Sequence, residues 1–270
     1  MLTPRYPVYI PSKGRADCGL TARFLDHDRV PFHLVVEPQE AKAYSARFGA
    51  ERVLVLPFSN LGQGSIPARN WIKDHATKAG AKRHWQLDDN IRYVGRLWKG
   101  KRCRCDSGPA MRAVEDFTDR YENVAISGLD YEMFVIPTTR NPPPFYLNSR
   151  VYSCGLFLNA TPFRWRGRYN EDTDLCLQAL AKGWCTLLVT VFYVAKMRTM
   201  KMKGGNTAVL YQGDGRLKMA RSLERVWPGV VTVDRRFKRP QHVVANSWRS
   251  FDTPLRPAKG LRIERKPKEY

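Results

Sequence analysis

Short apolar runs alternate with longer amphipathic stretches over the first ninety residues of the chain. Four runs have the length and composition of β-strands: 6–10, 31–36, 53–56 and 84–87. Three stretches between them carry apolar side chains at helical spacing: about 18–27, 39–48 and 65–79. Pro67 falls in the first turn of the third stretch, where proline is tolerated. Strands and helices that alternate at this spacing predict a parallel sheet with right-handed crossover connections.

Polar side chains follow these runs at the points where the predicted strands end. The first run is followed by the turn Pro-Ser-Lys-Gly-Arg at 11–15, the second by Glu37, and the fourth by Asp-Asp-Asn at 88–90. Ligands of a parallel sheet bind outside the carboxyl ends of its strands. We therefore expect six side chains to gather at one edge of the sheet: Ser12, Arg15, Glu37, Arg69, Asp88 and Asp89.

The Leu-Asp-Asp-Asn motif at 87–90 is the most informative of these stretches. Two adjacent carboxylates and an amide offer the oxygen ligands that Mg²⁺ or Mn²⁺ prefers, and two phosphates of a nucleotide usually complete the shell. The alternative is a strand followed by a solvated acidic turn.

A second acidic motif, Asn-Glu-Asp-Thr-Asp-Leu at 170–175, opens an apparent helix that extends from Leu175 to Lys182. Carboxylates in a first helical turn are favoured by the helix dipole, so capping explains some of them. Three acids within four residues exceed what a cap requires, which indicates a further role for this motif.

The chain is strongly basic, with 46 Lys and Arg residues against 25 Asp and Glu and a formal net charge of +21. A field of that size favours polyanions, although general solubility is the alternative explanation. The cations are clustered beside the candidate motifs, at 92–104, 196–203 and 235–239. This clustering favours a polyanionic partner such as nucleic acid.

The composition is that of a globular protein, with 43% hydrophobic residues and seven Trp. No apolar run approaches the roughly 20 residues that span a bilayer, and the first residues lack the apolar core of a signal peptide. We therefore expect no membrane partner and a cytoplasmic location. The six cysteines lack the paired spacing of a metal site, so we expect thiols in a reducing compartment.

Taken in order, the turn at 11–15, Glu37, Gly-Ser-Ile-Pro-Ala-Arg-Asn at 64–70 and Leu-Asp-Asp-Asn resemble the first half of a GT-A fold glycosyltransferase. The resemblance implies a single Rossmann-like α/β domain with a mixed, mainly parallel central sheet over residues 1–251. Residues 1 to about 95 would bind a nucleotide-sugar, and about 96 to 251 the acceptor. Residues 252–270, rich in Pro, Lys and Arg, would form a basic C-terminal tail. Nucleotidyltransferases share a similar core, but they favour a Gly-rich loop where this chain has one glycine.

With the Asn-Glu-Asp-Thr-Asp-Leu motif, Gly-Gly-Asn-Thr at 204–207 and a late histidine, the chain resembles the TET-associated glycosyltransferases of bacteriophages from about residue 5 to 250. The resemblance implies an inverting, metal-dependent enzyme that moves a sugar from UDP-glucose or UDP-N-acetylglucosamine to 5-hydroxymethylcytosine, or a related hydroxymethylpyrimidine. The acceptor would be double-stranded phage DNA in the host cytoplasm, protected in this way from restriction. Two alternatives remain: a non-DNA acceptor, or a catalytically silent DNA-binding module. Intact acids in both motifs count against the silent module.

The resemblance also assigns roles to individual residues. Asp172 is the expected base that takes a proton from the acceptor hydroxyl, with Glu171 as the alternative. The expected metal ligands are Asp89 and His242. Asn90 stands where a third acid is common, which leaves Asp89 as the one strong ligand in the Asp-Asp-Asn motif. For His242 the alternative is a surface or core histidine. The expected nucleotide-sugar contacts are Pro11, Ser12, Arg15, Glu37, Arg69, Asp88, Asp89 and Lys203.

A base in duplex DNA has to leave the stack before it reaches a buried carboxylate. Trp165 and Tyr169 are the aromatic residues predicted to hold it, because Arg164, Arg166 and Arg168 alternate with them. Aromatic and basic side chains in alternation suit a groove that faces DNA, whereas the alternative is a half-buried strand.

Overall fold

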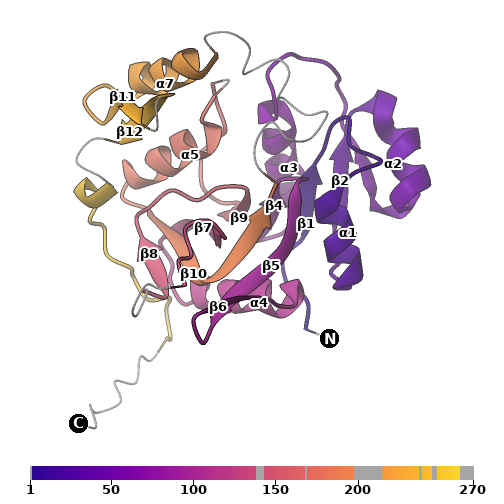
Figure 1. Ribbon diagram of the computed structural model, residues 1–270, viewed down its shortest axis with the longest axis horizontal. Coiled ribbons are helices and arrows are strands. Elements are labelled where there is room, and N and C mark those ends of the chain that lie inside the picture. Colours follow the sequence, from indigo (N-terminus) through magenta and orange to yellow (C-terminus); the bar gives the residue numbers. More distant parts are fainter. Residues whose placement is uncertain are drawn as a thin grey trace.

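The computed structural model describes residues 2–137, 143–167, 169–197, 215–236, 239–244 and 248–261. Within these residues ten strands form one mixed sheet, in the order β3-β2-β1-β4-β9-β7-β10-β5-β6 with β8 also paired to β10 (Figure 1). The strands are β1 (Val8–Pro11), β2 (His33–Val36), β3 (Val53–Val55), β4 (Arg83–Leu87), β5 (Ile91–Trp98), β6 (Lys101–Arg104), β7 (Val124–Tyr131), β8 (Phe145–Leu147), β9 (Cys154–Leu158) and β10 (Cys185–Lys196). The helices are α1 (Leu20–His27), α2 (Ala41–Phe48), α3 (Ile66–Lys78), α4 (Ser107–Thr118), α5 (Glu171–Leu180) and α7 (Gly215–Val226). A separate hairpin is formed by β11 (Val231–Arg236) and β12 (Arg239–Val244), and short 3₁₀ turns are η1 (Pro38–Glu40), η2 (Ala50–Arg52) and η3 (Trp248–Ser250).

The N-terminal half is the alternating parallel unit that the apolar pattern predicts. β1 pairs in parallel with both β2 and β4, and β2 pairs in parallel with β3. Each strand and helix expected in this half is present, with its ends shifted by no more than two residues. The predicted α/β fold with a mixed central sheet is confirmed; its parallel pairs lie in the N-terminal half and between β7 and β10.

Helices cover both faces of the parallel strands, because alternate side chains of a strand point to opposite faces. On one face Tyr9 packs with Ile72 of α3. On the other face Ile10 packs in a cluster with Phe24 of α1 and Met111 of α4. The strand β4 is buried along its whole length. Because β4 lies near the middle of the strand order, the residues that follow it lie near the middle of the sheet edge.

Helix α5 begins four residues earlier than the sequence predicts, at Glu171 and not at Leu175, so the acids of its motif lie in its first turn. Asn170 precedes the helix with a φ of 56°, and its side-chain amide donates to the Met219 carbonyl at 2.8 Å. Asparagine tolerates this left-handed conformation better than most residues. Leu175 faces the main sheet, while Leu177 packs with α7 and the β11–β12 hairpin.

The segment 252–261 lies on the surface of the same domain. The Arg256 carbonyl accepts from the Glu122 N–H at 3.0 Å, and the Arg256 N–H donates to Asn123 Oδ1 at 2.8 Å. Pro257 and Tyr121 form an isolated bridge. The predicted tail therefore begins as a docked segment, and residues 262–270 lie outside the described part of the chain.

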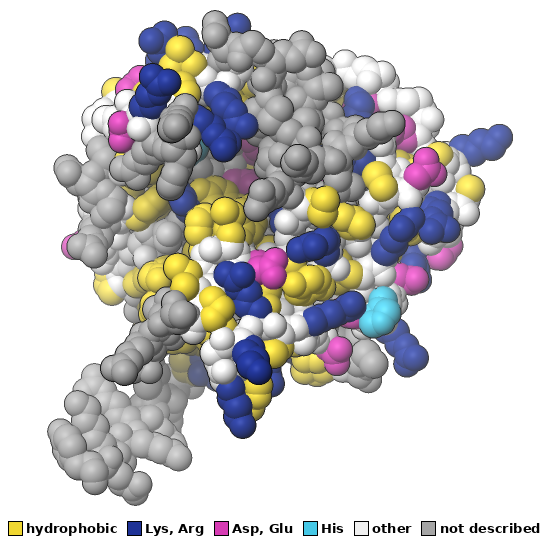
Figure 2. All heavy atoms as spheres, in the orientation of Figure 1, with side chains coloured by type: hydrophobic (Ala, Val, Ile, Leu, Met, Phe, Trp, Pro, Cys, Tyr) yellow, Lys and Arg dark blue, Asp and Glu magenta, His cyan; other side chains and the backbone are white. Residues whose placement is uncertain are grey.

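Exposed cations gather on the β5–β6 hairpin. Figure 2 shows Lys and Arg side chains over the lower part of the molecule, where this hairpin lies in Figure 1. Near the turn, Trp98 is 52% exposed, and the Arg96 guanidinium carbon lies 4.7 Å from its ring centre. An exposed aromatic ring among cations suits an anionic partner with stackable groups.

The six cysteines are free thiols, as expected from their spacing, and Cys154, Cys176 and Cys185 are buried. In the described part of the chain, no helix combines the length and the apolar character that a bilayer crossing requires.

Candidate active site

The carboxyl ends of the parallel strands open into a cavity of about 280 Å³. Strands β1, β2, β7 and β10 and the turn that follows β4 supply side chains to it, and α3 and α5 supply others from their first turns. Nine predicted site residues line this cavity: Pro11, Ser12, Arg15, Glu37, Arg69, Asp88, Asp89, Glu171 and Asp172. The fold thus brings the two acidic motifs, which are distant in the sequence, to one site.

At one end of the cavity, Asp89 is held by the turn that follows β1. Ser12 Oγ donates to one carboxylate oxygen of Asp89 at 2.7 Å, and the Arg15 guanidinium pairs with the other. The Tyr44 hydroxyl lies 2.7 Å from Ser12 Oγ and accepts from the Arg15 N–H at 3.0 Å. Burial raises the pKa of Asp89, and Arg15 and Ser12 oppose that rise. Both Asp89 oxygens are therefore engaged by protein donors.

The same end of the cavity carries an ion pair above an apolar wall. Lys13 Nζ donates to Glu37 Oε2 at 2.6 Å. Although burial opposes it, the bonds from Lys13 and Gln39 lower the pKa of Glu37, so it stays ionised. Val35 and Leu56 line the cavity beside them. A mainly apolar wall with a few placed polar groups is typical of sites that bind a base and ribose.

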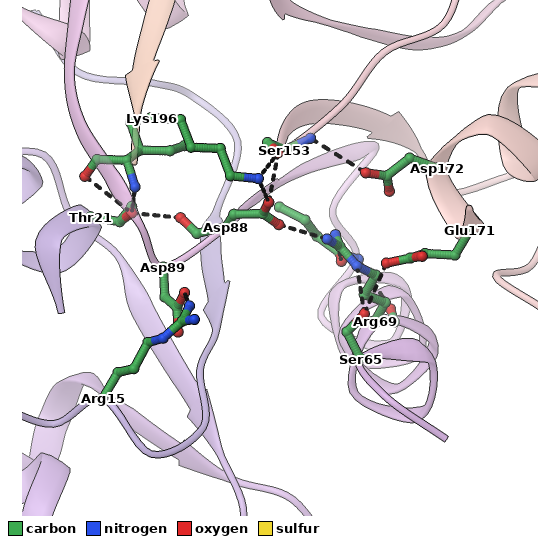
Figure 3. Close-up of polar contacts among 12 residues, drawn as sticks. Arg15, Thr21, Ser65, Arg69, Asp88, Asp89, Ser153, Glu171, Asp172 and Lys196 are labelled. Carbon is green, nitrogen blue, oxygen red and sulfur yellow. Dashed lines mark hydrogen bonds and ion pairs between the residues drawn. The ribbon is translucent and has the colours of Figure 1, made fainter. Parts of the chain in front are cut away.

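Asp88 lies at the centre of a cluster of cations (Figure 3). Its Oδ2 accepts from Lys196 Nζ at 2.6 Å and from Ser153 Oγ at 2.6 Å, while its Oδ1 accepts from Arg69 Nη2 at 2.7 Å. Burial opposes ionisation, but Lys196 and Arg69 hold the pKa of Asp88 well below its usual range. Asp88 is therefore a fixed negative charge that positions two cations.

Lys196 reaches this cluster from the carboxyl end of β10. The pairing of β10 with β5 shifts register between Ala195 and Lys196, and irregularities of this kind redirect side chains. Its Nζ also donates to Ser153 Oγ at 2.7 Å and lies 5.7 Å from the ring centre of Tyr131. Although burial would lower it, the carboxylate of Asp88 raises the pKa of Lys196 above its ordinary value. The ammonium is thus charged and fixed.

The turn between β4 and β5 is fixed by Thr21 near the start of α1 (Figure 3). Thr21 Oγ1 donates to the Asp88 carbonyl at 2.5 Å and accepts from the Ile91 N–H at 2.9 Å. The Thr21 N–H donates to the Asp89 carbonyl at 3.3 Å. The backbone of both acids is therefore anchored independently of their carboxylates.

Arg69 is held by polar side chains that β4 presents toward α3. Its Nη1 donates to Gln86 Oε1 at 3.5 Å, and Gln86 Nε2 donates to the Arg69 carbonyl at 3.0 Å. Burial lowers the pKa of His84 to about 4, so its neutral ring can accept from Gln86 Nε2 at 2.9 Å. Burial opposes the charge of Arg69, but Asp172 and Asp88 raise its pKa and keep it protonated.

The first turn of α5 places Glu171 and Asp172 across the cluster from Asp89 (Figure 3). Ser65 Oγ donates to Glu171 Oε1 at 3.2 Å, and the Ser153 N–H donates to Asp172 Oδ2 at 3.5 Å. Burial raises the pKa of both carboxyls; Asp172 adds to the rise at Glu171, and Arg69 opposes it at Asp172. Weakly held carboxylates with raised pKa values are suited to proton transfer near neutral pH.

The donor set of the Asp-Asp-Asn turn does not fit a divalent cation. Both oxygens of Asp88 and both of Asp89 accept from protein donors, as described above. Asn90 Oδ1, buried without a hydrogen-bond partner among the described residues, would be a single neutral ligand. Mg²⁺ and Mn²⁺ need several available oxygens, and the described residues include no group of three His, Cys, Asp or Glu placed to hold a metal. Metal binding by Asp89 stays a prediction that this geometry does not support.

His242, the other predicted metal ligand, lies on β12 opposite Val233 of β11 and is not among the residues that line the cavity. Burial lowers the pKa of His242 to about 4, and Arg150 adds to that effect. The hairpin packs on α7 and α5, one layer outside the main sheet. Its role as a ligand also stays a prediction.

The predicted stacking residue Trp165 lies in the core. It is 2% exposed and packs edge-on against Phe157, with 4.8 Å between ring centres. A base cannot stack on a ring that is covered in this way, so the placement favours the alternative of a half-buried segment. Arg166 points outward but pairs with Asp174 at 2.9 Å, and Tyr169 is partly exposed. The other two predicted contacts, Arg168 and Lys203, lie outside the described residues.

The sequence alone does not single out Tyr131 and Ser153, and it marks Lys196 as one cation of a basic cluster. A usable signal exists for Tyr131 and Lys196, since each ends a long apolar strand, β7 or β10, that runs in parallel with the other. Ser153 has no such signal; its φ of 52° reflects the tertiary fold around it.

Comparison with known proteins shows the family to which this chain belongs. A model of the TET-associated glycosyltransferase family matches residues 6–205, a span that contains every residue lining the cavity. A comparison with curated proteins gives no match. Because the family match covers well over half of the 270 residues, the chain belongs to the TET-associated glycosyltransferase family and is a glycosyltransferase.

Proposed function

We propose that this enzyme transfers the sugar of a UDP-sugar to the hydroxyl of 5-hydroxymethylcytosine in double-stranded DNA, with inversion at the anomeric carbon. The observation that supports this proposal is the order of groups along the cavity. Figure 3 shows Asp89 at one end, the cations around Asp88 in the middle, and Glu171 and Asp172 at the other end. Glu37 lies at the Asp89 end, since it pairs with Lys13 of the turn that holds Asp89.

In this proposal the nucleotide lies at the Glu37 end, where Val35 and Leu56 provide apolar surface. Its diphosphate then lies beside Arg69 and Lys196, whose charges attract phosphate oxygens. The sugar projects toward α5, so that its anomeric carbon faces Asp172.

The chemistry that follows needs one base and one leaving group. Asp172 takes the proton of the acceptor hydroxyl while that oxygen forms a bond to the anomeric carbon. The bond from the anomeric carbon to the diphosphate oxygen breaks, and its electron pair leaves with UDP. Glu171 is either the alternative base or a ligand that orients the hydroxyl.

The charge of the chain supports DNA as the acceptor. The net charge is +21, and the β5–β6 hairpin exposes Arg96 and Lys99 beside the ring of Trp98. Phosphate contacts of this kind dominate the affinity of proteins for DNA. A glycan or protein acceptor would not require them.

The test is transfer from UDP-glucose, UDP-N-acetylglucosamine and other UDP-sugars to duplex DNA with and without 5-hydroxymethylcytosine. The DNA is digested, and its nucleosides are weighed by mass spectrometry. We expect one donor to add a single hexose or N-acetylhexosamine to hydroxymethylcytosine alone, and Asp172→Asn to abolish the product. Transfer to small hydroxyl acceptors but not to DNA would identify a different acceptor, and DNA binding without transfer would identify the silent module.

A further inference from the structure

We propose that Lys196 and Arg69 act as built-in cations that stabilise the departing diphosphate, so that sugar transfer by this enzyme requires no divalent metal. This inference rests on the proposed transfer from a nucleotide diphosphate sugar. It departs from the metal dependence that the sequence predicts, because the donor set around Asp88 and Asp89 does not fit a metal.

The two cations are held on opposite oxygens of one carboxylate. Lys196 Nζ lies 2.6 Å from Asp88 Oδ2, and Arg69 Nη2 lies 2.7 Å from Asp88 Oδ1. Their side chains are 19% and 5% exposed, respectively, yet both line the cavity. Charges fixed in this way need little reorganisation when negative charge develops next to them.

Lys196 retains a donor for a ligand. An ammonium has three N–H donors, and in the described residues Asp88 and Ser153 accept two of them. The third N–H is available to a phosphate oxygen in the cavity. In Figure 3 Lys196 and Arg69 lie between Asp89 on one side and Asp172 on the other, where the proposed path of the donor places its diphosphate.

The charge balance of the transfer step suits this pair. Bond cleavage adds a negative charge to the diphosphate, because the electron pair of the broken bond stays on its oxygen. Lys196 and Arg69 carry two positive charges beside the carboxylate of Asp88. Asp172 also acts on Arg69, but it loses its negative charge when it takes the acceptor proton, so the two cations can offset the charge that develops on the diphosphate. A bound divalent cation supplies the same electrostatic stabilisation in metal-dependent phosphate chemistry.

The ion pairs at Asp88 also oppose metal binding. A metal ion that took its oxygens would displace an ammonium and a guanidinium that are both largely buried. Buried charges deprived of their partner are strongly unfavourable. Asp88 is therefore better described as the residue that positions Lys196 and Arg69 than as a metal ligand.

The first test compares rates with and without metal. The full chain is treated with EDTA and desalted, and transfer to hydroxymethylcytosine DNA is measured in EDTA and with added Mn²⁺ or Mg²⁺. We expect kcat in EDTA to lie within about twofold of kcat with metal, since the charge that the metal would supply is built in. A loss of tenfold or more in EDTA that Mn²⁺ restores would overturn the inference.

The second test removes the ammonium. In EDTA, Lys196→Met is expected to lower kcat by about 100-fold or more, the usual effect of losing one preorganised charge-stabilising donor. Lys196→Arg is expected to recover part of that loss. UDP affinity, measured by calorimetry in EDTA, is expected to fall with Lys196→Met, which a merely structural role would not cause. Unchanged kcat and UDP affinity in a folded Lys196→Met protein would contradict the proposal.

Lys73 provides a matched control, because it is also a buried lysine. Its Nζ donates to the carbonyls of Thr161 at 2.5 Å and Phe163 at 2.7 Å, and it does not line the cavity. Lys73→Met is expected to lower the melting temperature while leaving kcat and UDP affinity close to those of the unmodified chain. An equal loss of kcat in both variants would show that lysine burial, and not the position of Lys196, is responsible.

The two proposals fail in different ways. If no UDP-sugar and no acceptor gives product in EDTA or with metal, the proposed function fails. If transfer occurs only with metal, the proposed function stands and the role of Lys196 and Arg69 as built-in cations is rejected.

Discussion

Asp88 and Asp172 are two carboxylates of the same cavity that both accept a hydrogen bond from Ser153, but their other hydrogen bonds differ. Ser153 donates to both, from Oγ to Asp88 at 2.6 Å and from its N–H to Asp172 at 3.5 Å. Asp88 has two further partners, Lys196 at 2.6 Å and Arg69 at 2.7 Å. For Asp172, in the described residues, the Ser153 N–H is the one hydrogen bond seen.

The pKa values of the two acids shift in opposite directions as a result. Burial raises the pKa of Asp172, and the charge of Arg69 offsets only part of the rise. At Asp88 the two cations outweigh burial and hold its pKa well below the usual range. Two partly buried acids in one cavity therefore have different uses: Asp88 is a permanent charge that positions cations, and Asp172 is a group that can exchange a proton.

The largest expected effect is the loss of this exchangeable group. Asp172→Asn keeps the shape of the side chain but cannot accept the acceptor proton, so we expect kcat to fall by about 1000-fold, within the range for general-base catalysis. UDP affinity is expected to stay within about twofold, because Asp172 acts on the acceptor and not on the nucleotide. Steady-state kinetics and calorimetry measure the two effects.

Glu171→Gln is the matched control for this prediction, since it removes the neighbouring charge. A smaller loss of kcat than in Asp172→Asn identifies Asp172 as the base; the reverse order identifies Glu171.

The pH profile of kcat supplies a second check on the base. The kcat of the unmodified chain is expected to fall as pH drops through the raised pKa of the base, because the protonated acid cannot accept a proton.

The next effect in size concerns stability. Asp88→Asn leaves the charges of Lys196 and Arg69 side by side without their carboxylate, and breaking a buried ion pair in this way costs about 3 kcal/mol. Urea denaturation at pH 7 is expected to show this loss in the free energy of unfolding. The same variant is also expected to lose activity, since both cations lose their anchor.

The pH dependence of that loss has a definite sign. The folded-state pKa of Asp88 is depressed, so its contribution to stability is present above its unfolded pKa of about 3.9 and declines as pH falls toward the folded value. The difference between the unmodified chain and Asp88→Asn should therefore shrink below pH 4. A constant difference down to pH 3 would mean that the ion pairs are not its source.

The surroundings of these two acids also show which parts of the fold can be predicted from the sequence. The alternating parallel half follows from its apolar periodicity, and the end of β4 at Leu87 places the Asp-Asp-Asn turn at the sheet edge. The start of α5 was less predictable. Asn170 adopts a left-handed φ of 56° there, stabilised by a bond to Met219 that depends on α7.

Within the site, the sequence identifies the acids but not what holds them. Lys196 and Ser153 are far from Asp88 in the chain, and they meet it because β9 and β10 belong to the same sheet as β4. For Trp165, the local sequence suggests a binding role that the burial of its side chain does not support. Its alternation with arginines resembles a binding groove, whereas packing against Phe157 places it in the core. Local pattern cannot distinguish these cases, because burial is decided by elements from elsewhere in the chain.

The smallest expected effect is a gain in the free energy of unfolding when Asp172 is replaced by Asn. Because the folded-state pKa of Asp172 is raised, the fold favours its protonated form, and ionisation is unfavourable once pH exceeds that value. Asp172→Asn removes this cost and should raise the free energy of unfolding by about 1 kcal/mol at pH 8, a common gain when a functional group is replaced. The gain should vanish as pH falls below the unfolded pKa, where the carboxyl is protonated in both states. Thermal melts at pH 8 and across the acid range measure it. Destabilisation at pH 8 would show instead that Asp172, like Asp88, is anchored by its charge, and the distinction between the two carboxylates would fail.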